Sequence, residues 1–160
     1  MPGVADAHFN LGNEFVAKGD YDGAIAAYLE AIRLAPDDAE AHCNLGHALT
    51  RQGRLQDALS SLRNGHEIGS KRPDWALPSK EWVESAERKA KMEGRLDQML
   101  SGGERPRDAV ERITFAELLY LKSRHSESAR MYAEAFAEDA ALAEDLAQGH
   151  RYNAACSATR

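Results

Sequence analysis

Part of this sequence repeats itself at a fixed spacing of 34 residues. Histidine, leucine, glycine and alanine positions of residues 8–36 return in the same order in the residues that follow. A constant period of this size is typical of proteins built from one recurring helical unit, because each unit buries its apolar side against the next. The pattern predicts a stacked-repeat architecture, which usually works by offering a surface. The matching pairs are His8 and His42, Leu11 and Leu45, Gly12 and Gly46, Gly19 and Gly53, Ala24 and Ala58, and Leu34 and Ile68.

Each repeat has the pattern of two helices joined by a glycine. Apolar residues recur at helical spacing on either side of Gly19 and again on either side of Gly53. Asp37 and Glu40 predict a capping box at the start of the second repeat. The predicted helices cover residues 5–18, 21–34, 39–52, 55–67, 79–100, 109–122, 127–138 and 140–147.

The small and aromatic residues of the two repeats match a known signature. The positions that carry it are Leu11, Gly12, Tyr21, Ala24, Tyr28, Ala31 and Pro36, then Leu45, Gly46 and Ala58, with Leu62 in the second aromatic position. On these residues the sequence resembles the tetratricopeptide repeat. The resemblance implies an all-α fold, a right-handed solenoid of antiparallel helix pairs in which the first helix of each pair lines a concave groove.

The middle of the chain departs from the repeat. Two prolines flank Trp75 in the linker 69–78, and we expect this tryptophan to hold the linker against a neighbouring helix. The long helix over 79–100, with Ser79 as its cap, is expected to brace the repeat blocks. The predicted organisation is two repeats in 1–70, a linker and long helix in 71–108, and a divergent third repeat with the opening of a fourth in 109–160. In the third repeat the signature positions are Ala116, Tyr132 and Ala135, and the fourth opens at Tyr152.

The second half also resembles a narrower group. The segments RPDW…LP, RMYAEAF and HRYNAAC are similar to the C-terminal repeat region of bacterial serine/threonine kinases of the planctomycete type. This resemblance covers about residues 5–160 and implies an accessory module of a bacterial signalling enzyme. The sequence contains no glycine-rich phosphate loop, VAIK lysine, HRD or DFG, so kinase activity is not expected.

The resemblance to tetratricopeptide repeats implies which residues face the groove. The main candidates are Phe9, Asn13, Asn44, Cys43, His47, Arg51, Glu117 and Tyr120, with Val16, Ala17, Thr50, Ile113 and Leu121 at related positions. Asn13 and Asn44 match two asparagines of the clamp with which some family members hold acidic chaperone tails. That clamp also needs basic residues, and Phe9 stands at one of their positions. A different peptide or protein ligand in the groove, and plain packing or solvation of these side chains, are the alternatives.

Composition and motifs argue against several other functions. The net charge is −6 and there is no basic stripe, so nucleic acid is not an expected partner. No apolar run is long enough to span a membrane, and the first residues lack the pattern of a secretory signal, so a cytoplasmic location is expected. Cys43 and His47 share a helix face, but two ligands are too few for a structural metal site. We expect no catalytic residues, no metal and no cofactor.

The sequence therefore predicts a non-catalytic scaffold that binds a peptide or protein in the groove of its repeats. Two alternatives stay open. The first is an oligomerisation or structural module that self-associates through the apolar residues of its C-terminal end. The second is a regulatory fragment of a kinase.

Overall fold

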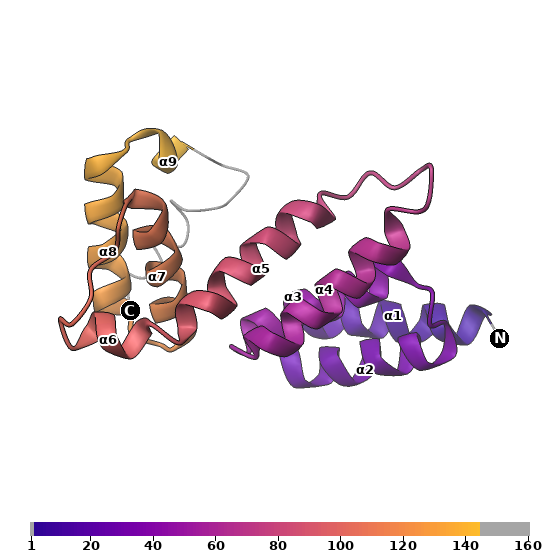
Figure 1. Ribbon diagram of the computed structural model, residues 1–160. Helices are drawn as coiled ribbons and strands as arrows, with labels where there is room; N and C mark the ends of the chain where they lie inside the picture. The colour runs from indigo at the N-terminus through magenta and orange to yellow at the C-terminus, as the bar shows by residue number, and fades with distance from the viewer. Residues whose placement is uncertain (1, 145–160) are drawn as a thin grey trace. The chain divides into compact units, whose positions relative to one another are not determined.

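The computed structural model describes residues 2–144, which form helices and no strand (Figure 1). None of these helices combines the length and the apolar character that crossing a membrane requires. The chain divides into two compact units, one ending at Glu87 and the other beginning at Arg88. The helices are α1 (Pro2–Ala17), α2 (Tyr21–Leu34), α3 (Ala39–Arg51), α4 (Leu55–Gly69), α5 (Ser79–Glu93), α6 (Leu96–Leu100), α7 (Ala109–Leu121), α8 (His125–Glu138) and α9 (Ala141–Glu144).

Helix pairs form the core of each unit. In the first unit α1 packs against α2, α3 packs against α4, and α2 packs against α3, so two helix pairs stack side by side (Figure 1). In the second unit α7 packs against α8. The predicted all-α fold of stacked helix pairs is confirmed. The first core contains Ala24, Ile25, Tyr28, Leu45, Ala48, Leu49 and Ala58.

Small residues stand where the two helices of a pair cross. A Cβ atom added at Gly12 would lie 2.4 Å from the ring of Tyr28, and one at Gly46 would lie 2.6 Å from Cγ of Leu62. In the third pair Ala116 takes this position and is fully buried, and its carbonyl accepts a 2.7 Å hydrogen bond from Ser128 Oγ. The recurring glycine and alanine positions of the sequence are thus the points of closest helix approach.

The turn between the helices has the same geometry in all three pairs. Gly19 and Gly53 both have φ of 75°, and Ser123 takes the equivalent place with φ of 58°. The backbone N–H of each donates to the carbonyl three residues earlier, and the next N–H donates to a carbonyl five residues earlier. This is the Schellman ending, which needs the left-handed backbone that glycine adopts most easily.

The linker before α5 is held by its tryptophan, as predicted. The indole of Trp75 lies against Gly69, where an added Cβ would approach it to 2.4 Å. Trp75 Nε1 donates to Ser79 Oγ at 2.8 Å, and Nδ1 of His66 lies 2.9 Å from the same oxygen. Ser79 is the first residue of α5, and its buried hydroxyl joins the linker to α4 instead of serving as the expected cap.

Two further local predictions were wrong. The cap of α3 is Asp38, whose carboxylate accepts from the N–H groups of Glu40 and Ala41, and not Asp37. The single helix expected over 79–100 is two helices, because the chain turns at Gly94 and Arg95. Glycine is a weak helix former, and the turn lets the apolar side chains of α6 reach the core of the second unit.

Arg95 fixes this turn with its side chain. Its guanidinium donates to Glu104 and to Glu111, and it lies 5.6 Å from the ring centre of Phe115. The hydrogen bonds from Arg95 are the main cause that holds the pKa of Glu104 and of Glu111 below the ordinary carboxyl value.

The predicted fourth repeat, with Tyr152, and the C-terminal apolar residues lie outside the described residues.

Candidate functional site

Two of the predicted groove residues meet across the first helices of adjacent repeats. Asn13 lies on α1 and Asn44 on α3, and Asn44 Nδ2 donates to Asn13 Oδ1 at 3.1 Å. The same Oδ1 accepts a 2.7 Å hydrogen bond from the hydroxyl of Tyr28. We call these two side chains the amide pair. It combines residues 31 positions apart, as the stacking of the two repeats requires.

The buried side chain of Tyr28 holds the amide pair in place through its hydroxyl group. Its side chain is 1% exposed and packs among the core residues of α2 and α3. Burial raises the pKa of its hydroxyl above the ordinary value, so the group stays protonated and donates. The orientation of the Asn13 amide is therefore fixed by a buried donor, and its Oδ1 already accepts two hydrogen bonds.

The amide pair keeps hydrogen-bonding capacity at the surface. Asn13 is exposed and Asn44 is half-buried. Within residues 2–144, Asn13 Nδ2 and Asn44 Oδ1 have no hydrogen-bond partner. One unused donor on α1 and one unused acceptor on α3 therefore belong to two side chains that are hydrogen-bonded to each other.

Apolar side chains of α1 and one arginine of α3 accompany the amide pair on these two helices. Phe9 is half-buried against Tyr28, with ring centres 6.0 Å apart, and Val16 remains 39% exposed. Arg51 lies near the end of α3, where Nε donates to the Tyr21 hydroxyl at 3.2 Å. Its guanidinium carbon lies 5.8 Å from the centre of the Tyr21 ring. These side chains form, with the amide pair, what we call the α1–α3 surface.

Cys43 does not belong to this surface, and its assignment to the groove was wrong. The side chain is fully buried, and its sulfur occupies the space beside Gly65, where an added Cβ would approach it to 2.5 Å. Burial raises the pKa of the thiol to about 11. Cys43 is a packing residue between α3 and α4, and the glycine on α4 makes room for it.

His47 is reached by another part of the same chain. Its ring makes an edge-on contact with Trp82 of α5, with ring centres 4.6 Å apart. His47 stands one repeat after Asn13, so the position next along the predicted groove is covered by an aromatic side chain of α5.

The third-repeat candidates lie in the second unit and have partners there. Glu117, which stands at the equivalent position to His47, pairs with Lys89 of α5 at 2.9 Å, and both side chains are mostly buried. Tyr120 makes an edge-on contact with His125, with ring centres 5.3 Å apart. Sequence reasoning missed Trp82 and Lys89 as neighbours of these positions, because α5 lies outside the repeat pattern.

The described residues show no arrangement for metal chemistry. Between residues 2 and 144 no group of three or more His, Cys, Asp and Glu side chains is placed to hold a metal ion.

Sequence reasoning also missed the role of Tyr28 in holding the amide pair, although its aromatic position in the repeat was recognised. The signal was present in the spacing, since Tyr28 lies on the helix that packs against both α1 and α3.

Comparisons with known proteins find a match to a repeat family within the first unit. Residues 12–53, from within α1 to just beyond α3, match the family model described as TPR repeat. The chain is 34% identical over 70 residues to stress-induced-phosphoprotein 1 of Caenorhabditis elegans. That alignment covers 44% of this chain and only 22% of the relative's length.

A solved structure of similar extent overlaps only loosely. It is the TPR2B-domain:pHsp70-complex of yeast Sti1. The match covers 97% of this chain and 96% of that chain, at 17% sequence identity and a TM-score of 0.41.

Proposed function

We propose that this protein is a non-catalytic interaction scaffold that holds a peptide segment of another protein on the α1–α3 surface. The observation that carries the proposal is the amide pair. It offers one donor, Asn13 Nδ2, beside one acceptor, Asn44 Oδ1, and both lack a partner within the described part of the chain.

The chemistry of the amide pair suits a peptide backbone. A peptide group in extended conformation offers one C=O acceptor and one N–H donor, and both must be satisfied when water is displaced. Asn13 donates to the carbonyl and Asn44 accepts from an N–H. Because the Tyr28 hydroxyl already fixes Asn13, little side-chain entropy is lost on binding. Phe9 and the exposed Val16 supply apolar contacts for the side chains of the ligand.

The proposed ligand does not need a free C-terminus. The carboxylate clamp suggested by the two asparagines requires cations beside them, and Phe9 occupies one of those positions. The arginine of α3, Arg51, donates to the Tyr21 hydroxyl and lies over its ring. The proposal is therefore recognition of the main chain within a peptide.

The first part of the test is selection of peptides from a random displayed library on the full chain, followed by titration of the selected peptides. In Asn13→Asp the carboxylate keeps the acceptor that Tyr28 and Asn44 use, but the Nδ2 donor is lost. The bound peptide carbonyl is then unsatisfied, which costs about 1–3 kcal/mol, or roughly 5- to 150-fold in Kd.

The matched control is Asn64→Asp, which makes the same chemical change at an exposed position on α4. It should leave Kd unchanged, and thermal unfolding should show both variants folded. If Asn13→Asp binds the selected peptides as tightly as the parent protein, the α1–α3 surface is not the binding site. Amidation of the peptide C-terminus should have little effect, and loss of binding on amidation would favour a clamp.

The other sequence-based hypotheses stay predictions. Self-association through the C-terminal end concerns residues beyond 144. The kinase-accessory role depends on a kinase, and this sequence contains no kinase motifs. The cytoplasmic location expected from the sequence stays a prediction as well.

A further inference from the structure

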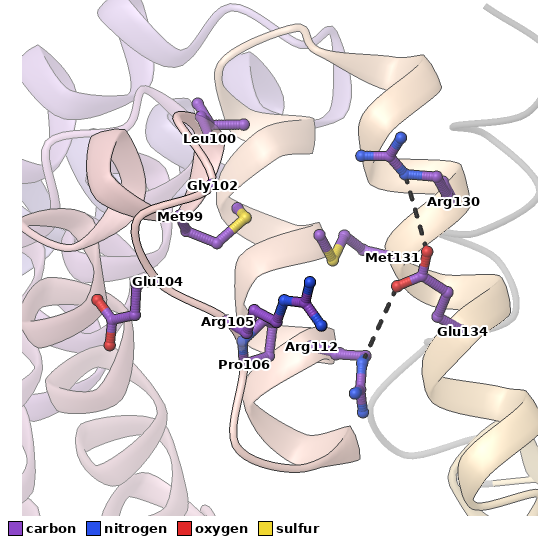
Figure 2. A pocket seen from close by; sticks show the side chains of 10 residues that line it. All are labelled: Met99, Leu100, Gly102, Glu104, Arg105, Pro106, Arg112, Arg130, Met131 and Glu134. Carbon is purple, nitrogen blue, oxygen red and sulfur yellow. Dashed lines mark ion pairs between the residues drawn. The ribbon is translucent and has the colours of Figure 1, made fainter.

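The second unit contains a cavity that the proposed function does not use. Its volume is about 350 Å³, and it lies between the segment that follows α6 and the helices α7 and α8 (Figure 2). This volume is at the lower end of the range for ligand sites, roughly 300–1,000 Å³. The space therefore suits one side chain of a larger ligand better than a whole cofactor.

The inner wall of the cavity is apolar and adaptable. Met99 of α6 and Met131 of α8 line it, and each is only 7% exposed. Pro106 adds a rigid apolar edge. Methionine side chains are unbranched and polarizable, so they adjust to apolar groups of different shape.

Three arginines from separate elements surround this wall (Figure 2). Arg105 comes from the segment before α7, Arg112 from α7 and Arg130 from α8. Arg105 is exposed and makes no hydrogen bond or ion pair with any residue from 2 to 144.

Carboxylates near the cavity pair with two of these three arginines and leave the third without one among the described residues. Glu134 is shared by two arginines, with Arg130 Nε at 3.8 Å and Arg112 Nε at 4.0 Å, both beyond hydrogen-bonding distance. Glu104 also lines the cavity, but Arg95 engages its carboxylate. Even with the ion pair between Arg112 and Glu138 counted, the guanidinium of Arg105 is left for an incoming anion.

We propose that this cavity is a second binding site, which takes an acidic peptide segment of a partner protein. One apolar side chain of the segment lies on Met99 and Met131, and flanking carboxylates pair with Arg105 and Arg130. The charge of the cavity favours acidic side chains, because guanidinium groups bind carboxylates through paired hydrogen bonds. A free phosphate would leave the methionine wall uncovered, and therefore a peptide fits the two properties together.

The test uses short fluorescein-labelled peptides with a central Leu, Met or Phe flanked by Asp and Glu. Matched peptides carry Asn and Gln in place of the acidic residues, or Ala in place of the apolar one. Fluorescence anisotropy with the full chain should show binding of the acidic apolar peptides. Both matched sets should bind at least about tenfold more weakly, and raising the salt from about 0.15 M to about 1 M should weaken binding of the acidic set.

Arg105→Glu is the decisive variant, because the side chain is exposed and, among residues 2–144, has no partner whose loss would affect folding. It should weaken binding by at least about tenfold. The control is Arg88→Glu, an equal charge change at an exposed arginine of the same unit that does not line the cavity. Its effect should stay within about twofold, since a remote exposed charge acts only through screened, long-range attraction.

Several results would overturn the proposal. Equal losses in the two arginine variants would show attraction by overall charge, and binding unaffected by Arg105→Glu would place the peptide elsewhere. Full competition by inorganic phosphate, with no preference for the apolar residue, would show a simple anion site. Absence of binding by every acidic peptide would exclude the site. The amide pair of the first unit is not involved, so Asn13→Asp should leave this binding unchanged.

Discussion

The left-handed turn that ends the first helix of each pair should set a measurable part of the stability. Gly19 and Gly53 occupy it in the first unit, both with φ of 75°, whereas Ser123 occupies it in the second with φ of 58°. We predict that Ser123→Gly stabilises the second unit and that Gly19→Ser and Gly53→Ser destabilise the first. The turn hydrogen bonds are equivalent in all three places, so the substitutions compare one backbone conformation in one setting.

The magnitude follows from two opposing effects. A left-handed residue other than glycine costs roughly 1–2 kcal/mol, because its Cβ crowds the following carbonyl. Glycine loses more backbone entropy on folding, which returns roughly 0.5–1 kcal/mol. Side-chain crowding adds nothing at Gly19 or Gly53, since no atom lies within 4 Å of an added Cβ. The expected net effect is therefore about 1 kcal/mol at each turn.

Urea unfolding can separate the two units. The chain has two tryptophans, Trp75 and Trp82, and both lie before Arg88, so fluorescence reports on the first unit. Far-ultraviolet circular dichroism reports on the helices of both. Each kcal/mol should move the midpoint by roughly 0.3–1 M urea. If Ser123→Gly lowers the stability, or if Gly53→Ser has no effect, the conformational argument is refuted.

Three further outcomes are expected. Gly46→Ala should destabilise the first unit by about 1–2 kcal/mol in urea unfolding, because overpacking against Leu62 outweighs the better helix propensity of alanine; unchanged stability would contradict the close crossing. In a Cys156→Ser background, Cys43 should not react with a thiol reagent near pH 8 until urea unfolds the protein, since its pKa is raised to about 11 and it is buried. The two carboxylates that pair with Arg95 have lowered pKa values, so the unfolded chain binds more protons than the folded chain as pH falls below about 4.5. Their stabilisation is complete above that pH and is lost below it, and Arg95→Met should flatten this part of the stability-against-pH curve measured by circular dichroism.

The repeat period predicted the helices and their crossings because it records packing constraints. Gly12 and Gly46 recur since a larger residue would overlap Tyr28 or Leu62 on the facing helix. The helices of the first unit and the places where they cross could therefore be predicted from the sequence.

Departures from the repeat were less predictable. The turn at Gly94 depends on tertiary contacts, in which Arg95 reaches Glu104 and Glu111. A periodic pattern of apolar residues does not reveal such contacts, because polar side chains set the direction of the chain there.

Only part of the candidate site could be predicted. The pairing of Asn13 with Asn44 follows from the stacking of two repeats, whereas the burial of Cys43 depends on the space left by Gly65. The contact of Trp82 with His47 involves α5, which belongs to no repeat. The arginine-lined cavity of the second unit had no sequence signal, because Arg105, Arg112 and Arg130 come together only through the fold.

The side-chain amide signals of the asparagines provide the most direct test of the proposed peptide site. A nuclear magnetic resonance titration of the isotope-labelled chain with a selected peptide would follow Asn13, Asn44 and Asn64 separately. The account predicts that the Asn13 and Asn44 signals shift together with a common Kd, while the Asn64 signal stays in place. Saturated binding that leaves Asn13 and Asn44 unmoved would contradict it.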